Sequence, residues 1–210
     1  MKMHYYTREG VSIENIFWYI ALVVFVISLV IGYMIHVDST KEGIKGTISI
    51  LWAGSPLMVW TVVYWLFEHY LWKIFPINSF LKIPDLEGEY KGTLKSSFDN
   101  FEIKYPIKLR IRQTFSRISI LMEMENASSK SYSLNAFLEN RGEEILLIYN
   151  YQNEPLDRKK ATLNEHKGTA ILKFSSDSSS FTGNYFTDKR PKDREEAICN
   201  YGEMNGKRVR

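Results

Sequence analysis

Two long apolar stretches without charged residues dominate the first third of the chain, and no similar stretch follows them. They run from Ile16 to Ile35 and from Gly46 to Phe67. A membrane-spanning helix needs about 20 apolar residues, and the first stretch is apolar on all sides of its expected helix, which leaves no polar face for water. The pattern predicts a membrane protein in which residues 1–83 form a two-helix transmembrane hairpin, with spans at about 16–35 and 46–67.

Alternation of apolar and polar residues replaces this pattern after Pro84. Between Glu102 and Phe115, aliphatic residues and tyrosine hold one parity while charged residues hold the other, as in a half-buried strand. With turn-rich separators, the same signal predicts strands at Gly88–Lys95, Ile103–Gln113, Arg117–Glu125, Ser131–Glu139, Ile145–Tyr151, Gly168–Phe174, Phe181–Thr187 and Ala197–Tyr201. Residues 84–210 are therefore expected to form an all-β antiparallel barrel of about eight strands, with a β-sandwich as the alternative.

The charge balance and the single cysteine restrict the partners and the compartment. The chain holds 27 Lys plus Arg against 24 Asp plus Glu, a net charge of +3, which predicts a near-neutral surface and no DNA or RNA polymer as partner. The lysines nearest the apolar stretches favour the flank of the large domain, so residues 84–210 are expected in the cytosol with both termini. The lone Cys199 agrees, because an exported domain of this size would gain from disulfides.

Catalytic and metal-binding patterns are not apparent in the sequence. Four scattered histidines and one cysteine do not have the usual spacing of metal ligands, and no glycine-rich loop precedes a helix. We therefore expect no catalytic residue, no metal and no cofactor, and a protein that is not an enzyme. An esterase that uses Ser128 or Ser131 with His166 is a minor alternative.

The inward parity of the expected strands is not purely apolar. It also carries Tyr90, Gln113, Tyr149, Tyr151, Asn153, His166 and Tyr185. Buried tyrosines are ordinary core residues, but aromatic rings with converging amide and hydroxyl groups are also what a small-molecule pocket requires. Both interpretations stay open on this pattern alone.

Six ordered segments resemble a known family. They are Asp85–Gly92 (DLEGEYKG), Ile111–Ser116 (IRQTFS), Ser128–Ser133, Tyr149–Asn153 (YNYQN), His166–Thr169 (HKGT) and Gly183–Arg190 (GNYFTDKR). In order and spacing, and together with the two preceding apolar stretches, they resemble the two-transmembrane, β-strand-rich effectors of bacterial CBASS antiphage systems. The resemblance implies an inner-membrane protein whose barrel binds a cyclic dinucleotide as its activating ligand. Binding would drive homo-oligomers whose spans disrupt the lipid bilayer and kill the cell.

The residues of the barrel can be assigned roles on that basis. Base stacking on an aromatic ring contributes about 1 to 3 kcal/mol, and Tyr90, Tyr149, Tyr151 and Tyr185 offer such rings. Hydrogen bonds to base edges are expected from Gln113, Ser131, Ser133, Asn153 and Thr187, and phosphate contacts from His166 and Arg190. Arg110 and Arg112 hold the outward parity, which favours a solvated basic face.

Two other functions fit the same patterns. An eight-stranded barrel can equally enclose a lipid or another apolar small molecule. A barrel whose interior is filled by its tyrosines would instead serve as a structural adaptor that binds protein.

Overall fold

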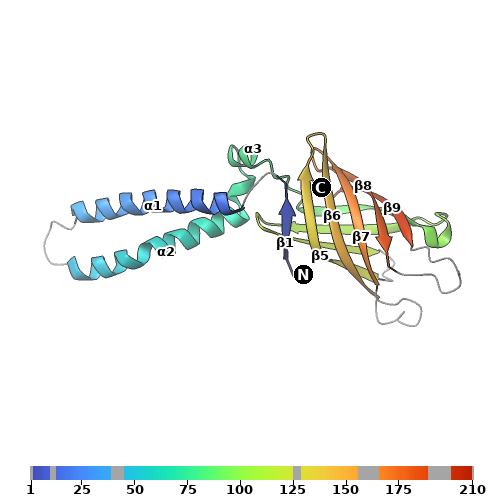
Figure 1. Ribbon diagram of the computed structural model, residues 1–210, viewed down its shortest axis with the longest axis horizontal. Helices are drawn as coiled ribbons and strands as arrows, with labels where there is room; N and C mark the ends of the chain where they lie inside the picture. The colour runs from blue at the N-terminus through green and yellow to red at the C-terminus, as the bar shows by residue number, and fades with distance from the viewer. Residues whose placement is uncertain are drawn as a thin grey trace. The chain divides into compact units, whose positions relative to one another are not determined.

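The chain divides into two units, which are described separately. The computed structural model describes residues 2–9, 13–38, 45–124, 129–155, 166–188 and 200–209. One unit comprises Gly10–Leu81, and the other comprises Met1–Glu9 together with Lys82–Arg210. Figure 1 labels the α-helices of the first unit and several strands of the second.

The helical unit is a pair of long helices followed by two short ones. Its elements are α1 (Ile13–Asp38), α2 (Lys45–His69), the 3₁₀ helix η1 (Leu71–Lys73) and α3 (Ile77–Leu81). Ile16, Ile20, Val24 and Ser28 recur every fourth residue and are the buried stripe of α1. Phe17 stacks on Tyr64 of α2 with ring centroids 5.2 Å apart, so α1 packs along α2. Apolar side chains between the stripe residues, such as Leu22 and Phe25, are exposed.

The prediction of a transmembrane hairpin is wrong. Both apolar stretches form helices, but within the described residues no helix combines the length and the apolarity that crossing a bilayer requires. The prediction rested on the length of the two stretches, their lack of charged residues and the apolar surface of the first one. It gave too little weight to Pro56 and to the glycines, serines and threonines interspersed in the sequence of α2.

The second unit is a closed barrel. Its strands are β1 (His4–Arg8), β2 (Gly88–Ser96), β3 (Tyr105–Gln113), β4 (Arg117–Met124), β5 (Ser129–Asn140), β6 (Glu144–Pro155), β7 (His166–Ser175), β8 (Ser180–Thr187) and β9 (Tyr201–Arg208). Antiparallel neighbours follow the order β4-β3-β2-β9-β8-β7-β6-β5, and β4 pairs with β5 to close the ring. Figure 1 shows β5 to β9 following one another in the wall. Closure excludes the sandwich alternative, and the first seven predicted strands match β2 to β8 to within four residues.

Two strands differ from the sequence prediction. The last strand was placed at Ala197–Tyr201, whereas β9 runs from Tyr201 to Arg208. Its buried positions are Gly202, Met204 and Gly206, and two glycines give no apolar signal by which alternation can be recognised.

Strand β1 was not predicted, because it has five residues and only Tyr6 of them is buried. It lies where β4 and β5 separate. It pairs antiparallel with β4 at His4 and Tyr5 and parallel with β5 from Tyr6 to Arg8. The segment before α1 thus completes the barrel wall, although the sequence assigned residues 1–83 to the hairpin.

Gln113 ties three segments together at the end of β3. Its side-chain amide donates to the carbonyl of Pro84 at 3.0 Å and to the Tyr6 hydroxyl at 3.3 Å, while its Oε1 accepts from the backbone N–H of Leu86 at 2.8 Å. The Tyr6 hydroxyl in turn donates to the carbonyl of Phe115 at 3.0 Å. These bonds fasten β1 and the segment before β2 to the same end of the barrel.

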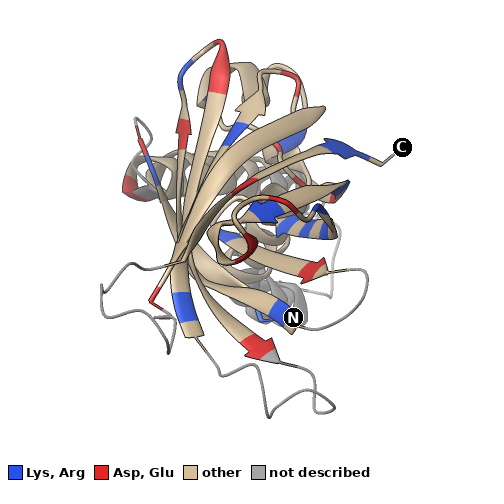
Figure 2. Cartoon of the chain, turned by 90° about the vertical axis from the view of Figure 1, so that its right-hand side faces the viewer, with Lys and Arg blue, Asp and Glu red and all other residues tan. Residues whose placement is uncertain are grey.

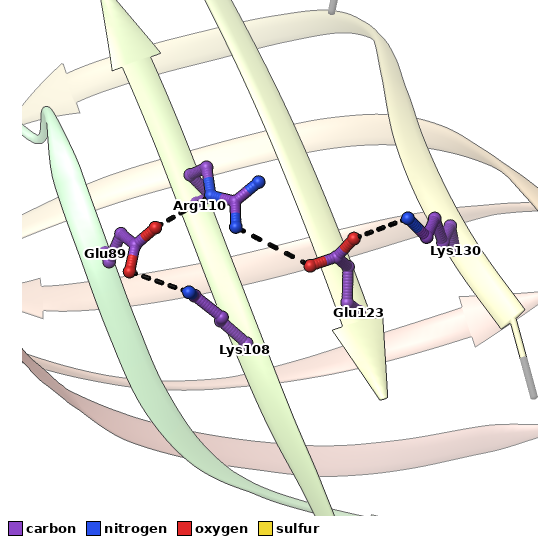
Figure 3. A network of polar contacts seen from close by, with 5 residues as sticks. All are labelled: Glu89, Lys108, Arg110, Glu123 and Lys130. Atoms are coloured by element: carbon purple, nitrogen blue, oxygen red, sulfur yellow. Dashed lines mark hydrogen bonds and ion pairs between the residues drawn. The ribbon is translucent and has the colours of Figure 1, made fainter. Parts of the chain in front are cut away.

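The outer face of β2 to β5 carries a network of ion pairs (Figure 3). Glu89 contacts Lys108 at 2.8 Å and Arg110 at 2.9 Å, and Glu123 contacts Arg110 at 3.7 Å and Lys130 at 2.8 Å. Hydrogen bonds from Lys108 and Arg110 lower the pKa of Glu89, and one from Lys130 lowers the pKa of Glu123. Figure 2 shows acidic and basic residues interspersed over the strands. Arg110 therefore faces outward, as its parity indicated, and its guanidinium forms ion pairs with the carboxylates of Glu89 and Glu123 on the barrel wall.

Candidate ligand-binding cavity

A cavity opens the barrel interior at one end. Because neighbouring strands alternate in direction, the last residues of β2, β4, β6 and β8 meet the first residues of β3, β5, β7 and β9 at this end. The cavity has a volume of about 420 Å³, within the range of about 300 to 1,000 Å³ that is typical of small-molecule sites. Gln113 and Tyr6 lie at the opposite end, where β3 finishes.

Six of the eleven predicted ligand-binding residues line this cavity. They are Ser131, Tyr151, Asn153, His166, Tyr185 and Thr187. The other lining residues were not named from the sequence: Leu94, Ser96, Phe98, Tyr105, Met122, Met124, Ser129 and Asn200.

The lining is polar on one side and largely apolar on the other. Strands β5 to β8 supply hydroxyl, amide and imidazole groups, whereas Leu94, Met122 and Met124 come from β2 and β4. Phe98, in the 3₁₀ helix η2 (Ser97–Asp99), adds an aromatic ring. The arrangement can accept a flat, partly apolar molecule that also offers several hydrogen-bonding groups.

Glycines opposite the tyrosines let the aromatic rings lie across the wall. Tyr151 is opposite Gly168 on β7, and Tyr185 is opposite Gly202 on β9. A Cβ atom at either glycine would overlap the facing ring, so any larger residue would displace it. The Tyr185 hydroxyl then donates to Ser96 Oγ at 2.9 Å, which fixes that ring in the cavity wall.

Asn153 and His166 form the closest polar contact between lining side chains on neighbouring strands β6 and β7. Asn153 Nδ2 lies 3.1 Å from His166 Nε2. The ring of Tyr151 meets the His166 ring edge-on, with centroids 6.4 Å apart. Burial raises the pKa of the Tyr151 and Tyr185 phenols, so both remain neutral hydrogen-bonding groups at physiological pH.

Four predicted site residues lie away from the cavity lining. Tyr90 is fully buried and donates its hydroxyl to the carbonyl of Leu86 at 3.1 Å, and Gln113 makes the bonds described above. Tyr149 is buried deeper in the barrel, one inward position before Tyr151.

Ser133, the fourth, accepts from the Ile120 N–H at 2.9 Å and contacts His4 Nε2 at 2.7 Å, in the wall beside β1. The fifth residue, Arg190, lies outside the described residues. The ligand-binding role of these residues stays a prediction.

Alternation along the strands could have identified most of the lining residues that were not predicted as ligand contacts. Ser96, Met122 and Met124 share the inward parity of their strands, and Ser129 shares that of Ser131. The two methionines were not predicted because only polar and aromatic residues were considered as ligand contacts. Phe98 and Asn200 lie outside the strands, where alternation gives no information.

The buried tyrosines predict an alkaline transition of the barrel. Burial raises the pKa of Tyr90 from 10 to about 12, and it raises those of Tyr149 and Tyr151 as well. Because the folded barrel holds these phenol protons more tightly than the unfolded chain does, the neutral tyrosines contribute their full stability below the unfolded pKa near 10. That contribution is lost as the pH rises through the folded pKa values.

We expect the barrel's unfolding midpoint to fall steeply above about pH 10, followed by far-ultraviolet circular dichroism alongside phenolate absorbance. Tyr149→Phe should make the fall shallower. Ionisation of every tyrosine near pH 10 with the barrel still folded would contradict this expectation.

Within the described residues, no three histidine, cysteine or carboxylate side chains are arranged to hold a metal ion.

Comparisons with known proteins identify a family for residues 81–208 and one relative that matches along the whole chain. Residues 81–208 match the family model of the Cap15 cyclic dinucleotide receptor domain. The chain is 26% identical over 222 aligned residues to the CD-NTase-associated protein 15 of Yersinia aleksiciae, covering 100% of this chain and 99% of that protein. It is 29% identical over 123 residues to the CD-NTase-associated protein 15 of Staphylococcus schleiferi, covering 58% of this chain and 64% of that protein. The resemblance found in the sequence is thus confirmed, and the chain belongs to the Cap15 cyclic dinucleotide receptor family of CBASS effectors.

Proposed function

We propose that the cavity binds one cyclic dinucleotide and that this ligand activates the protein in antiphage defence. The observation that carries the proposal is the cavity itself, in which tyrosine rings and converging hydroxyl, amide and imidazole groups surround about 420 Å³. Membership of a family described as cyclic dinucleotide receptors supports it.

The lining residues suit the parts of such a ligand. Tyr105, Tyr151 and Tyr185 offer ring surface for stacking a base, which contributes about 1 to 3 kcal/mol per base. Ser131, Asn153 and Thr187 supply groups for base edges. Two phosphodiesters also need donors, and His166 offers an imidazole N–H at the cavity, which becomes a charge-assisted donor when the ring is protonated.

Thermal unfolding of the full-length chain with a panel of cyclic di- and trinucleotides tests the proposal. A ligand at 100 times its Kd adds about 2.7 kcal/mol to the stability of the native state. All five tryptophans lie between Trp18 and Trp72, in the helical unit, so tryptophan fluorescence does not report on the barrel, and its unfolding is followed by far-ultraviolet circular dichroism.

A selective rise in the midpoint for one nucleotide supports the proposal. No shift with any nucleotide overturns it. Acyl chains that copurify with the protein would favour the lipid-binding alternative, for which the Leu94, Met122 and Met124 side of the cavity would be the contact surface.

The output proposed for the bound state is self-association followed by disruption of the inner membrane and cell death. A ligand can favour an assembled state only if it binds that state more tightly than the unassembled one. The exposed apolar side chains of α1, among them Trp18, Leu22 and Phe25, form a surface of the kind that marks contacts with protein or membrane.

Two measurements test this output. Sedimentation of the purified chain should show larger species only with the activating nucleotide. Infected cells should admit a membrane-impermeant dye when they carry the native chain, and cells that lack it should exclude the dye. Cell fractionation tests the inner-membrane location, and protease protection tests whether both termini face the cytoplasm. Full activity without assembly, or a chain found only in the soluble fraction after activation, would contradict the proposed output.

Arg110 should not contribute to nucleotide binding, because it faces away from the cavity. Its guanidinium pairs with Glu89 and Glu123 on the outer face (Figure 3). We expect Arg110→Gln to leave the Kd unchanged within about twofold and to lower the free energy of unfolding by less than about 1 kcal/mol, an effect that salt weakens. Isothermal titration and urea unfolding in low and high salt check both. A tenfold loss of affinity would place a ligand contact on this face.

A further inference from the structure

Three polar side chains form one cross-strand row at the cavity end of the barrel. Ser131 on β5 is directly opposite Asn153 on β6, which is directly opposite His166 on β7. All three line the cavity. A molecule in the cavity therefore meets a row of one hydroxyl, one amide and one imidazole.

The amide at the centre of the row is only half satisfied. Asn153 is 7% exposed, and its Nδ2 lies 3.1 Å from His166 Nε2. Its Oδ1 is buried and has no hydrogen-bond partner among the described residues. Buried side-chain oxygens are seldom left without a donor, so this oxygen indicates the place of a donor that a ligand brings.

The contact with His166 fixes which end of the amide meets the ligand. When Nδ2 donates to Nε2, the imidazole is neutral and carries its proton on Nδ1, and Oδ1 is left to accept from the ligand. A charged imidazole donates from both nitrogens, so it would repel Nδ2. The amide would then turn, with Oδ1 accepting from His166 and Nδ2 donating to the ligand.

The described ionisable groups nearest His166 in the sheet come from β6, β7 and the end of β8. From β6, Tyr151 meets it edge-on, while Glu154 holds the outward parity. Beyond the end of β8, Asp188 accepts from the backbone N–H of Lys167 at 2.9 Å, and the Lys167 side chain takes the outward parity of β7. The Asp188 carboxylate thus lies against the backbone of the residue that follows His166.

We propose that Asn153 selects the nucleobase and that the protonation state of His166 decides whether Asn153 presents an acceptor or a donor to the base edge. The inference rests on the proposed function, since it assigns the specificity of the same cavity. With His166 neutral, the site favours a base with an N–H group at this position. With His166 charged, it favours a base with a carbonyl or ring-nitrogen acceptor there.

The test is isothermal titration of the full-length chain at pH 5.5 and 7.5 with cyclic di-AMP, cyclic di-GMP, cyclic di-UMP and cyclic UMP–AMP, a range over which histidine titrates. The phosphodiesters stay ionised at both values. We expect the ratio of affinities for the best two nucleotides to change at least tenfold between the two pH values. His166→Gln keeps an amide that can bond Asn153 and does not titrate, so this variant should bind with the same ranking at both pH values. Asn153→Leu should reduce the discrimination among the four nucleotides.

The outcomes separate the inference from the function beneath it. Binding with one ranking at both pH values, or a pH-dependent ranking that survives in His166→Gln, overturns the inference and leaves the proposed function standing. No binding of any nucleotide to the native chain overturns both. Should Asn153→Leu fail to fold, Asn153→Asp keeps the oxygen and loses the donor, and it should retain binding only for the nucleotide preferred at pH 7.5.

Discussion

A Tyr151→Leu variant should bind its cyclic dinucleotide about 5- to 100-fold more weakly than the native chain, and the same change at Tyr149 should leave affinity unaltered. The two tyrosines lie two residues apart on β6 and share its inward face. Only Tyr151 lines the cavity, where its ring offers a surface for stacking. Leucine retains apolar volume at both sites, so the comparison isolates the aromatic face.

Tyr149 should instead report on the stability of the barrel. It is 2% exposed, and its hydroxyl has no hydrogen-bond partner among the described residues. Tyr149→Ala should lower the free energy of unfolding by about 3 to 5 kcal/mol, whereas Tyr149→Phe should raise it slightly by removing a buried unpaired hydroxyl. Urea unfolding followed by far-ultraviolet circular dichroism measures the first effect, and nucleotide titration of Tyr149→Leu serves as the binding control. Equal losses of affinity in both Leu variants would place the ligand deeper than the cavity.

Sequence alternation identified which face of each strand points inward, but it did not give the depth of each residue in the barrel. The side chains of Tyr90, Gln113 and Tyr149 are buried on the inward face of their strands, as the side chain of Tyr151 is. Tyr90 lies near the start of β2 and Gln113 at the end of β3, at the end opposite the cavity. In an up-and-down barrel, only the ends of even strands and the starts of odd strands share the cavity end, and that counting rule would have excluded both from the sequence alone.

Other features lay outside what local patterns can show. The place of β1 depends on a gap between β4 and β5, which no property of residues 4–8 reveals. The apolar stretches gave the helices correctly, because helix formation depends on local residues. Whether such a helix can cross a bilayer depends on its whole composition. The length and lack of charge of the two stretches overstated the capacity of these helices to span one.

Gln113→Ala should lower the free energy of unfolding by about 2 to 4 kcal/mol with no change in nucleotide affinity. The substitution removes the hydrogen bonds that Pro84, Leu86 and Tyr6 make with one buried amide. The Leu86 N–H then stays buried without its acceptor and the Pro84 carbonyl loses its donor, whereas the Tyr6 hydroxyl keeps its bond to Phe115. An unpaired buried donor or acceptor costs about 1 to 3 kcal/mol, partly recovered by rearrangement.

Asn153→Ala is the matched control, because it removes the other buried amide on an inward position. Within the described residues, the Asn153 side chain makes one hydrogen bond, with His166, and it lines the cavity, so its loss should weaken binding and change stability little. The two variants should therefore show opposite effects in the same pair of measurements, urea unfolding and nucleotide titration. Loss of affinity in Gln113→Ala with unchanged stability would return Gln113 to the ligand site that its sequence position first indicated.

Hydrogen exchange gives the Gln113 prediction spatial detail. Tyr6 precedes the helical unit in the chain and Pro84 follows it, and one amide joins both to the end of β3. In Gln113→Ala, exchange should quicken at the backbone amides of residues 4–8 and of Leu86, while β6 and β7 beside the cavity keep their protection. Faster exchange spread evenly over all strands would mean that the whole barrel is destabilised, and that Gln113 does not specifically fasten the two segments that flank the helical unit.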